Sequence, residues 1–341
     1  MSQGLKLFIL GAGCSVACGY PLGIGIPNAM KAFVETLDPA TSPKLIRCFK
    51  DTLEQFGRAE LVDTFDTFLQ QVDESRRLDN AEKAKIRLDA RIAVSVLFLS
   101  KEKEAQATGM KSYREFLSDV FPGSGDFWTH RDSPNRVLTF NYDRLFEIAF
   151  FHRFGEGFRN YGLYGGVVLN SGLDHVYDKE LRFSDAFSFL KLHGSVAFAA
   201  LDEFNDLRHR HSEDVTAPFI ADDSAFDLLA GNKGHNLWQP LIVFPHERHG
   251  ILGGRRKGVE ERYTRAVWTE AERLMARAEE IRIIGYSFAG IDRGPFLELL
   301  GQAKSCKRFV VQNPEATDIC QRIGLYHSEW KGKLEPANLK F

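Results

Sequence analysis

Six short apolar runs, each bounded by turn residues, constrain the fold of this chain more than any other feature of its sequence. The runs are Lys6–Leu10, Arg136–Phe140, Phe187–Leu192, Pro240–Phe244, Ile281–Gly285 and Lys307–Gln312. Most of them are continuous rather than alternating, which is typical of strands buried on both faces of a parallel sheet. Because helical stretches lie between several of them, the sequence predicts a Rossmann-like α/β fold with an open, parallel, six-stranded sheet.

A large helical insertion is expected after the first of these strands, over residues 27–121. The gap between the first two runs is too long for one crossover helix, and Pro27 suits a first helical position. Apolar residues recur there at helical spacing in three stripes. The stripes are Met30, Phe33, Val34 and Leu37; Leu61, Val62, Phe65, Phe68, Leu69 and Val72; and residues within Lys85–Leu99.

The predicted domain division follows from this order. Residues 1–26 and 134–320 form the sheet domain, residues 27–121 the insertion, and residues 321–341 a C-terminal tail. Residues 201–239 are polar and contain no cysteine, and we interpret them as a small irregular lid or interaction region within the sheet domain.

Composition excludes several classes of protein. The 44 Lys and Arg residues nearly balance the 46 Asp and Glu residues, which argues against a surface built to bind nucleic acid or an anionic membrane. The five cysteines form no Cys-x-x-Cys pair, so neither a zinc ribbon nor a disulfide framework is expected. The sequence shows no signal peptide and no apolar run near the ~20 residues that span a bilayer. These features predict a cytoplasmic protein that binds neither nucleic acid nor membranes.

Polar motifs follow five of the predicted strands at the same end. They are Gly11–Ser15, Asn141–Asp143, His193–Ser195, Gly285–Ser287 and Asn313–Glu315. Ligands of open parallel sheets bind at the carboxyl ends of the strands. Packing alone does not explain polar residues at one end of five strands, so the sequence predicts a binding site along this edge.

The first motif has both a functional and a structural explanation. Gly11 and Gly13 let the backbone approach a phosphate, and Ser15 offers a hydroxyl near a helix N-terminus, where anions are favoured. A plain turn with Ser15 as an N-cap would look the same. The loop is not the dinucleotide fingerprint Gly-x-Gly-x-x-Gly, because Val16 stands where the third glycine should be.

The second and third motifs supply candidate catalytic groups. Either Asn141 or Asp143 suffices to cap the helix that follows, which leaves the other free to face the cleft. His193 ends a strand and precedes a glycine, and the unperturbed pKa of histidine suits a general base. A purely structural role remains the alternative for His193. Ser287 and Asn313 could hydrogen-bond a ribose or a phosphate, but each is a weak signal when taken alone.

Together, these motifs resemble those of the sirtuin superfamily. "GAGCSVACGYP" is similar to the sirtuin loop Gly-Ala-Gly-x-Ser-x-x-x-Gly-x-Pro, "NYD" to its Asn-x-Asp element and "KLHGS" to its His-Gly element. "GYS" stands where sirtuins carry Gly-Thr/Ser-Ser, and "NPE" stands near their adenosine-ribose asparagine. The resemblance covers residues 5–23 and about 136–315 and leaves out the helical insertion.

Three departures separate this chain from the sirtuin deacylases. Leu22, Gly23 and Ile24 replace Asp-Phe-Arg after Pro21, residues 195–284 lack the four cysteines of the deacylase zinc module, and Phe140 stands where the Thr-Gln-Asn element has glutamine. In these respects the chain resembles the sirtuin-like NAD hydrolases of prokaryotic antiphage defence. The resemblance implies that residues 1–26 and 134–320 bind NAD as a substrate and that no metal is needed.

The resemblance also implies a role for each motif residue. Asn141 would orient the nicotinamide ribose and the attacking water, His193 would act as general base, and Asp143 would position the nicotinamide end. Contacts to the remainder of NAD would come from Gly11, Ala12, Gly13 and Ser15 at the diphosphate, Gly285 and Ser287 at a phosphate or ribose hydroxyl, and Asn313 at the adenosine ribose. The products would be nicotinamide and ADP-ribose.

By the same resemblance, the protein would be the NAD-depleting effector of an abortive-infection system. It would act as a homo-oligomer, with a partner defence protein of the ATPase or nuclease class, or both. Two alternatives remain open at this stage. One is an NAD-dependent protein deacylase, and the other is a non-catalytic sensor of NAD or ADP-ribose. The missing cysteines argue against the first, and the presence of both Asn141 and His193 argues against the second.

Overall fold

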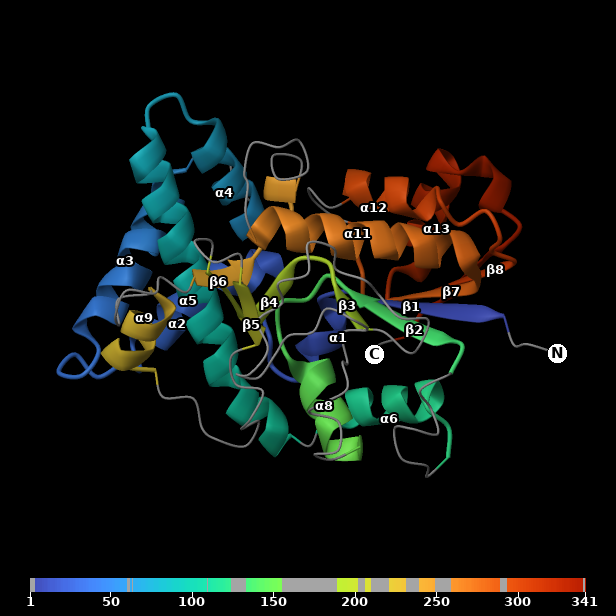
Figure 1. The fold of residues 1–341 in the computed structure, drawn as a ribbon, viewed down its shortest axis with the longest axis horizontal. Coiled ribbons are helices and arrows are strands. Elements are labelled where there is room, and N and C mark those ends of the chain that lie inside the picture. The colour runs from blue at the N-terminus through green and yellow to red at the C-terminus, as the bar shows by residue number, and fades with distance from the viewer. Residues whose placement is uncertain are drawn as a thin grey trace.

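A parallel sheet of six strands forms the centre of the molecule, and an antiparallel sheet of three strands lies beside it (Figure 1). The computed structural model describes residues 4–59, 62, 64–108, 110–123, 133–154, 189–201, 206–209, 221–230, 239–248, 259–288, 293–339 and 341. The predicted Rossmann-like fold, with six parallel strands and a helical region after the first, is confirmed.

The parallel sheet runs in the order β3-β2-β1-β7-β8-β9. Its strands are β1 (Leu5–Leu10), β2 (Asn135–Thr139), β3 (Phe189–Lys191), β7 (Ala278–Ile284), β8 (Arg308–Gln312) and β9 (Leu334–Ala337). The order reverses at β1, with β2 on one side and β7 on the other, each in parallel register. Such a switch point is where an open α/β sheet presents its ligand crevice.

One predicted strand belongs to the antiparallel sheet and not to the parallel sheet. The apolar run Pro240–Phe244 overlaps β6 (Gln239–Ile242). This strand pairs antiparallel with β4 (Gly194–Leu201) in the second sheet, which also contains β5 (Asp206–His209). A continuous buried run looks alike in either kind of sheet, so its sequence does not reveal the partner. The sixth parallel strand is instead β9, which lies within the predicted tail and contains Pro336. Proline is tolerated at a sheet edge, and β9 is an edge strand.

Alternate residues of the central strands face two separate cores. Leu7, Ile9 and Leu138 pack with helices on one face, and Phe8 and Leu10 pack with the insertion on the other. The first face carries α11 (Val259–Arg277), α12 (Arg293–Leu300) and α13 (Ala316–Tyr326), whereas α6 (Lys111–Val120) and α8 (Leu145–Phe154) lie on the opposite side (Figure 1). The two-residue period of side chains along a strand accounts for this division.

The predicted insertion forms a group of helices. They are α2 (Ile26–Val34), α3 (Pro43–Arg58), α4 (Phe65–Glu74), α5 (Asn80–Ala107) and α6. Asp79 begins α5 with a capping box, in which its carboxylate accepts from Glu82 N and Glu82 Oε2 accepts from Asp79 N. The stretch Ala90–Leu99 of α5 is buried on all sides, because α5 contacts other insertion helices and also β4 and β6. The insertion is therefore packed into the sheet domain.

Within residues 201–239, the described parts are β5 and α9 (Asp223–Leu229), which packs on α3, and the division into domains stays a prediction. Among the described helices, none is long and apolar enough to cross a membrane.

Candidate functional site

The five predicted motifs lie along one edge of the parallel sheet. Gly11 follows β1, Asn141 follows β2, His193 follows β3, Gly285 follows β7 and Asn313 follows β8. These five strands are consecutive neighbours in the sheet, so the carboxyl ends place the motifs side by side. The edge includes the switch point at β1.

Glycines allow the loop after β1 to pack directly against the end of β7. A Cβ on Gly11 would lie 2.6 Å from Tyr286 Cα, and one on Gly13 would lie 2.7 Å from Gly285 O. Gly285 itself has a φ of +65° and faces Cys14 N, so it too resists a side chain. Gly11 N and Gly13 N donate to Ile284 O and Gly285 O, each at 2.8 Å. Backbone packing alone thus requires these glycines, whether or not a phosphate also approaches them.

The helix after this loop is short, and the side chain of Ser15 does not cap it. Helix α1 (Gly13–Val16) has four residues, and Ala12 precedes it with an exposed side chain. Ser15 is buried and its Oγ donates to Asp143 Oδ2 at 2.7 Å. The expectation of a Ser15 N-cap is therefore wrong, and the hydroxyl instead links the first motif to the second.

Asn141 lies in the same buried network, and its amide orientation follows from its partners. Its Nδ2 donates to Gly11 O at 3.1 Å and to Ser15 Oγ at 3.2 Å. A carbonyl oxygen only accepts hydrogen bonds, so the amide atom that faces Gly11 O must be the nitrogen. Among the described residues, no donor lies within hydrogen-bonding distance of Asn141 Oδ1. Within the described part of the chain, this oxygen is therefore an acceptor that is available to a bound molecule.

Asp143 is the residue that caps helix α8. Its Oδ1 accepts from Leu145 N at 3.0 Å while its Oδ2 accepts from Ser15. The backbone oxygen of Asp143 accepts from the ammonium of Lys191, which also forms a 2.9 Å ion pair with Glu147. Burial raises the pKa of Glu147, and the charge of Lys191 opposes that rise. Of the two predicted candidates, Asp143 serves as the cap and Asn141 does not.

His193 is buried among aromatic rings and follows β3, the strand that pairs with β2 before Asn141. Backbone hydrogen bonds from Leu192 N to Thr139 O and from Val196 N to Tyr142 O hold the two segments together. The rings of Phe140 and Tyr142 lie 5.3 Å and 6.1 Å from the imidazole, centroid to centroid.

The electrostatics of this environment keep His193 neutral. Burial, reinforced by the positive charge of Arg248, lowers the pKa of His193 to about 3. The following residue must be glycine, because Gly194 has a φ of +73° and a Cβ there would lie 2.0 Å from Leu241 O. The imidazole is therefore uncharged at neutral pH and sits on a tightly packed turn.

The remaining predicted residues differ in their exposure. Ser287 is exposed just after β7. Asn313 is buried, donates from Nδ2 to Tyr286 O at 3.3 Å and accepts from Glu315 N at 2.9 Å. Asn313 thus holds together the ends of β7 and β8, and its predicted contact to a ribose stays a prediction.

Sequence reasoning missed the contribution of the insertion to this site. The hydroxyl of Tyr113, on α6, lies 2.9 Å from Ser15 Oγ. Glu102, on α5, forms a buried pair with Arg144, which directly follows Asp143. Tyr20 OH, in the loop after α1, donates to Phe98 O of α5 at 3.0 Å. These partners lie tens of residues apart, so their spacing gave no signal. The available sign for Tyr113 was its helical spacing from the apolar residues Phe116 and Leu117.

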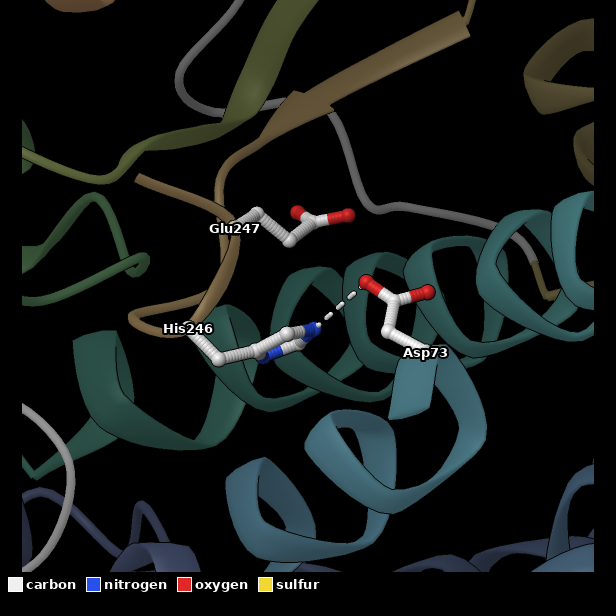
Figure 2. Close-up of side chains that lie close together, drawn as sticks. All are labelled: Asp73, His246 and Glu247. Atoms are coloured by element: carbon white, nitrogen blue, oxygen red, sulfur yellow. Dashed lines mark hydrogen bonds and ion pairs between the residues drawn. The ribbon is translucent and has the colours of Figure 1, made fainter. Parts of the chain in front are cut away.

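A second cluster of ionisable side chains joins α4 to the turn after β6. Figure 2 shows His246 directed at Asp73, with a 3.2 Å contact from Nε2 to Oδ2, and Glu247 nearby. Spacing of this kind can hold a metal ion. Arginines already neutralise both carboxylates, however, since Arg87 pairs with Asp73 and Arg91 donates to Glu247 at 3.0 Å. A divalent cation would face two guanidinium groups, so the cluster is an ion-pair network that fastens the insertion to the second sheet.

Comparisons with known proteins add a likeness to solved structures. No protein-family model matches the chain, and no curated protein matches it. A Sir2 homologue in complex with ADP-ribose is 14% identical and has a TM-score of 0.39, covering 99% of this chain and 88% of that one.

Two further Sir2 structures give similar values. A Sir2 homologue bound to NAD is 13% identical with a TM-score of 0.39, over 99% of this chain and 85% of that one. A mutant homologue bound to 2'-O-acetyl-ADP-ribose is 11% identical with a TM-score of 0.45, over 99% and 88%. With identities and TM-scores this low, the function of this chain has to be judged from its own residues.

Proposed function

We propose that the edge site binds NAD and hydrolyses its nicotinamide–ribose bond, releasing nicotinamide and ADP-ribose. The observation that carries this proposal is the buried amide of Asn141. Its nitrogen is held by Gly11 O and Ser15 Oγ, while its oxygen has no donor among the described residues. An acceptor fixed in this way can orient a ribose hydroxyl or a water molecule.

The departure of nicotinamide from NAD requires no proton transfer to the leaving group. As the bond between C1' of the ribose and the ring nitrogen breaks, its electron pair neutralises the cationic ring, so nicotinamide leaves without an acid. Positive charge develops on the ribosyl group, and a water oxygen then bonds to C1' and loses a proton. In our proposal Asn141 Oδ1 orients the ribose and this water.

The electrostatics around Asn141 suit such a transition state. The low pKa of His193 keeps its imidazole neutral, so the imidazole does not repel a cationic ribosyl group. An imidazole with so low a pKa is a weak base, so in our proposal His193 accepts a hydrogen bond from the attacking water and the proton of that water passes to solvent. The carboxylate of Asp143 lies one hydrogen bond from Ser15, and its negative charge favours developing positive charge nearby. We propose that the glycine loop, Ser287 and Asn313 contact the remainder of NAD.

The biological role is part of the proposal. By its resemblance to sirtuin-like defence enzymes, the protein would deplete NAD in infected bacteria, as an oligomer or with a partner protein. An enzyme of this kind must stay inactive until it is triggered, because NAD is essential to the cell that makes it.

Nicotinamide release tests this proposal. The purified chain is incubated with NAD, with and without an acetylated lysine peptide, alone and with the proteins that co-purify with it. We expect release that does not depend on the peptide and that falls at least ~100-fold in Asn141→Ala and His193→Ala. The control is Asn80→Ala, at an exposed asparagine on α5, which should release nicotinamide at the wild-type rate. Peptide-dependent release would identify a deacylase, and NAD binding without release, even with the co-purifying proteins present, would favour a sensor.

A further inference from the structure

Tyr113 of the helical insertion belongs to the hydrogen-bond network around Asn141. Tyr113 lies on α6, is 1% exposed, and places its hydroxyl 2.9 Å from Ser15 Oγ. Its ring packs edge-on against Phe341 at 5.1 Å, and Phe341 also packs against Phe116 of the same helix. This aromatic contact and the burial of the ring restrict the position of the Tyr113 hydroxyl.

The direction of the hydrogen bonds follows from a count of hydrogens. Ser15 has one hydroxyl hydrogen, and the carboxylate of Asp143 can only accept, so this hydrogen lies between Ser15 Oγ and Asp143 Oδ2. Ser15 Oγ must then accept from Tyr113. Burial, and after it the negative charge of Asp143, raise the pKa of the Tyr113 phenol, which keeps its hydrogen. The chain of donors thus runs from Tyr113 to Ser15 to Asp143.

Asn141 completes the coordination of the same oxygen. Ser15 Oγ donates once and accepts twice, from Tyr113 OH and from Asn141 Nδ2. An oxygen with three partners cannot rotate to another rotamer without breaking buried hydrogen bonds. The position of Ser15 Oγ therefore determines where one hydrogen of the Asn141 amide points.

We infer that Tyr113 is a positioning residue for Asn141, acting through Ser15 to hold the Asn141 amide with its oxygen toward the substrate. This role rests on the proposed function of Asn141, and it makes the insertion part of the site. Loss of the Tyr113 hydroxyl leaves Ser15 Oγ with two partners instead of three. The Asn141 amide then loses part of its orientation while its contact to Gly11 O remains.

Two measurements test the inference independently. The side-chain amide signal of Asn141 is identified in an NMR spectrum of the full chain as the one that disappears in Asn141→Asp. In the wild type both amide hydrogens are bonded and buried, so they exchange slowly with water. Tyr113→Phe should accelerate this exchange about tenfold and lower kcat for nicotinamide release by a similar factor, with KM within about twofold.

A matched variant controls for the loss of a buried hydroxyl. Tyr263 is buried, and its hydroxyl donates to Lys191 O at 2.6 Å, outside the network of Ser15. Tyr263→Phe should lower the melting temperature about as much as Tyr113→Phe but leave the amide exchange of Asn141 unchanged. If Tyr113→Phe does not fold, Ser15→Ala removes the same link and should accelerate the exchange as well.

The outcomes separate this inference from the proposed function. Wild-type amide exchange in a folded Tyr113→Phe overturns the positioning role, whatever happens to activity. Faster exchange in a protein that releases no nicotinamide under any condition supports the link from Tyr113 to Asn141 and contradicts the hydrolase. A fall in kcat without a change in exchange also overturns the inference, because Tyr113 would then act by another route.

Discussion

Two arginine–glutamate pairs share one geometry and lie in different parts of the molecule. In the inner pair, Arg144 Nε lies 2.7 Å from Glu102 Oε1 and its Nη2 bonds the other oxygen. In the outer pair, Arg308 on β8 makes the same two bonds to Glu335 on β9, at 2.9 Å and 2.7 Å. The inner side chains are 6% and 7% exposed, and the outer ones are 46% and 52% exposed.

The difference in burial gives the two pairs different functions. Water and salt screen the outer pair, so it adds little to the stability of the edge strand. The inner pair is buried and joins α5 of the insertion to the segment that carries Asn141 and Asp143. A buried charge requires its partner, so the inner pair ties the position of the insertion to that of the site.

The largest expected effect comes from breaking the inner pair. Glu102→Gln keeps the size of the side chain but removes the charge opposite Arg144. We expect the free energy of unfolding to fall by about 3–5 kcal/mol, because the buried guanidinium of Arg144 loses the charge of Glu102. Urea denaturation of the variant and the wild type measures this loss.

A double variant shows whether charge is the cause. Replacing both members by apolar residues, Glu102→Leu with Arg144→Met, leaves no uncompensated charge and should be more stable than Glu102→Gln alone. If the double variant is the less stable of the two, the pair acts through packing rather than through charge.

An intermediate effect concerns pH and the buried imidazole of His193. Its pKa is lowered from 6.5 to about 3 in the folded protein, so below pH 6.5 the unfolded chain binds a proton that the folded protein refuses. The stability contributed by neutral His193 is therefore complete above pH 6.5 and is lost as the pH falls toward 3, by about 1.4 kcal/mol per pH unit.

The comparison of the wild type with His193→Gln isolates this effect. Denaturation at pH 7, 5.5 and 4.5 should show a steeper loss of stability in the wild type than in the variant, since glutamine does not titrate. Equal slopes would mean that the folded protein accepts the proton and that His193 is less enclosed than the contacts with Phe140 and Tyr142 indicate.

The sequence predicted features that depend on neighbouring residues better than contacts between distant ones. The apolar runs and the motifs after them predicted the parallel sheet and the edge at which the motifs lie, because buried strands and strand-end residues are local signals. The start of α5 was also readable, since Asp79 and Glu82 form a capping box within four consecutive residues. One strand was misplaced and another was missed. β6 looks like any buried strand, and β9 is short, only partly buried and contains Pro336.

The sequence did not predict the side-chain contacts between the insertion and the candidate site. Ser15 and Tyr113 are 98 residues apart, and Glu102 and Arg144 are 42 residues apart. Helical periodicity places Tyr113 on the buried stripe of its helix, but it does not tell which part of the sheet that stripe covers. Tertiary packing alone brings the phenol to Ser15, so the residues added to the site come from the segment that the motif resemblance left out.

The smallest expected effect comes from breaking the outer pair. Arg308→Gln should lower the free energy of unfolding by less than about 1 kcal/mol, since both side chains are about half exposed. The pKa of Glu335 is lowered, first by its hydrogen bond to Arg308, so the contribution of the pair is present above the ordinary glutamate range and disappears as acid protonates the carboxylate. Salt should also reduce the contribution of the outer pair, because about 1 M NaCl shortens the Debye length to about 3 Å.

Denaturation of Arg308→Gln and Glu102→Gln in low and high salt compares the two pairs directly. The loss in Arg308→Gln should shrink in salt, and the loss in Glu102→Gln should stay. A salt-sensitive inner pair would show that water reaches Glu102 and that the insertion does not seal this part of the site.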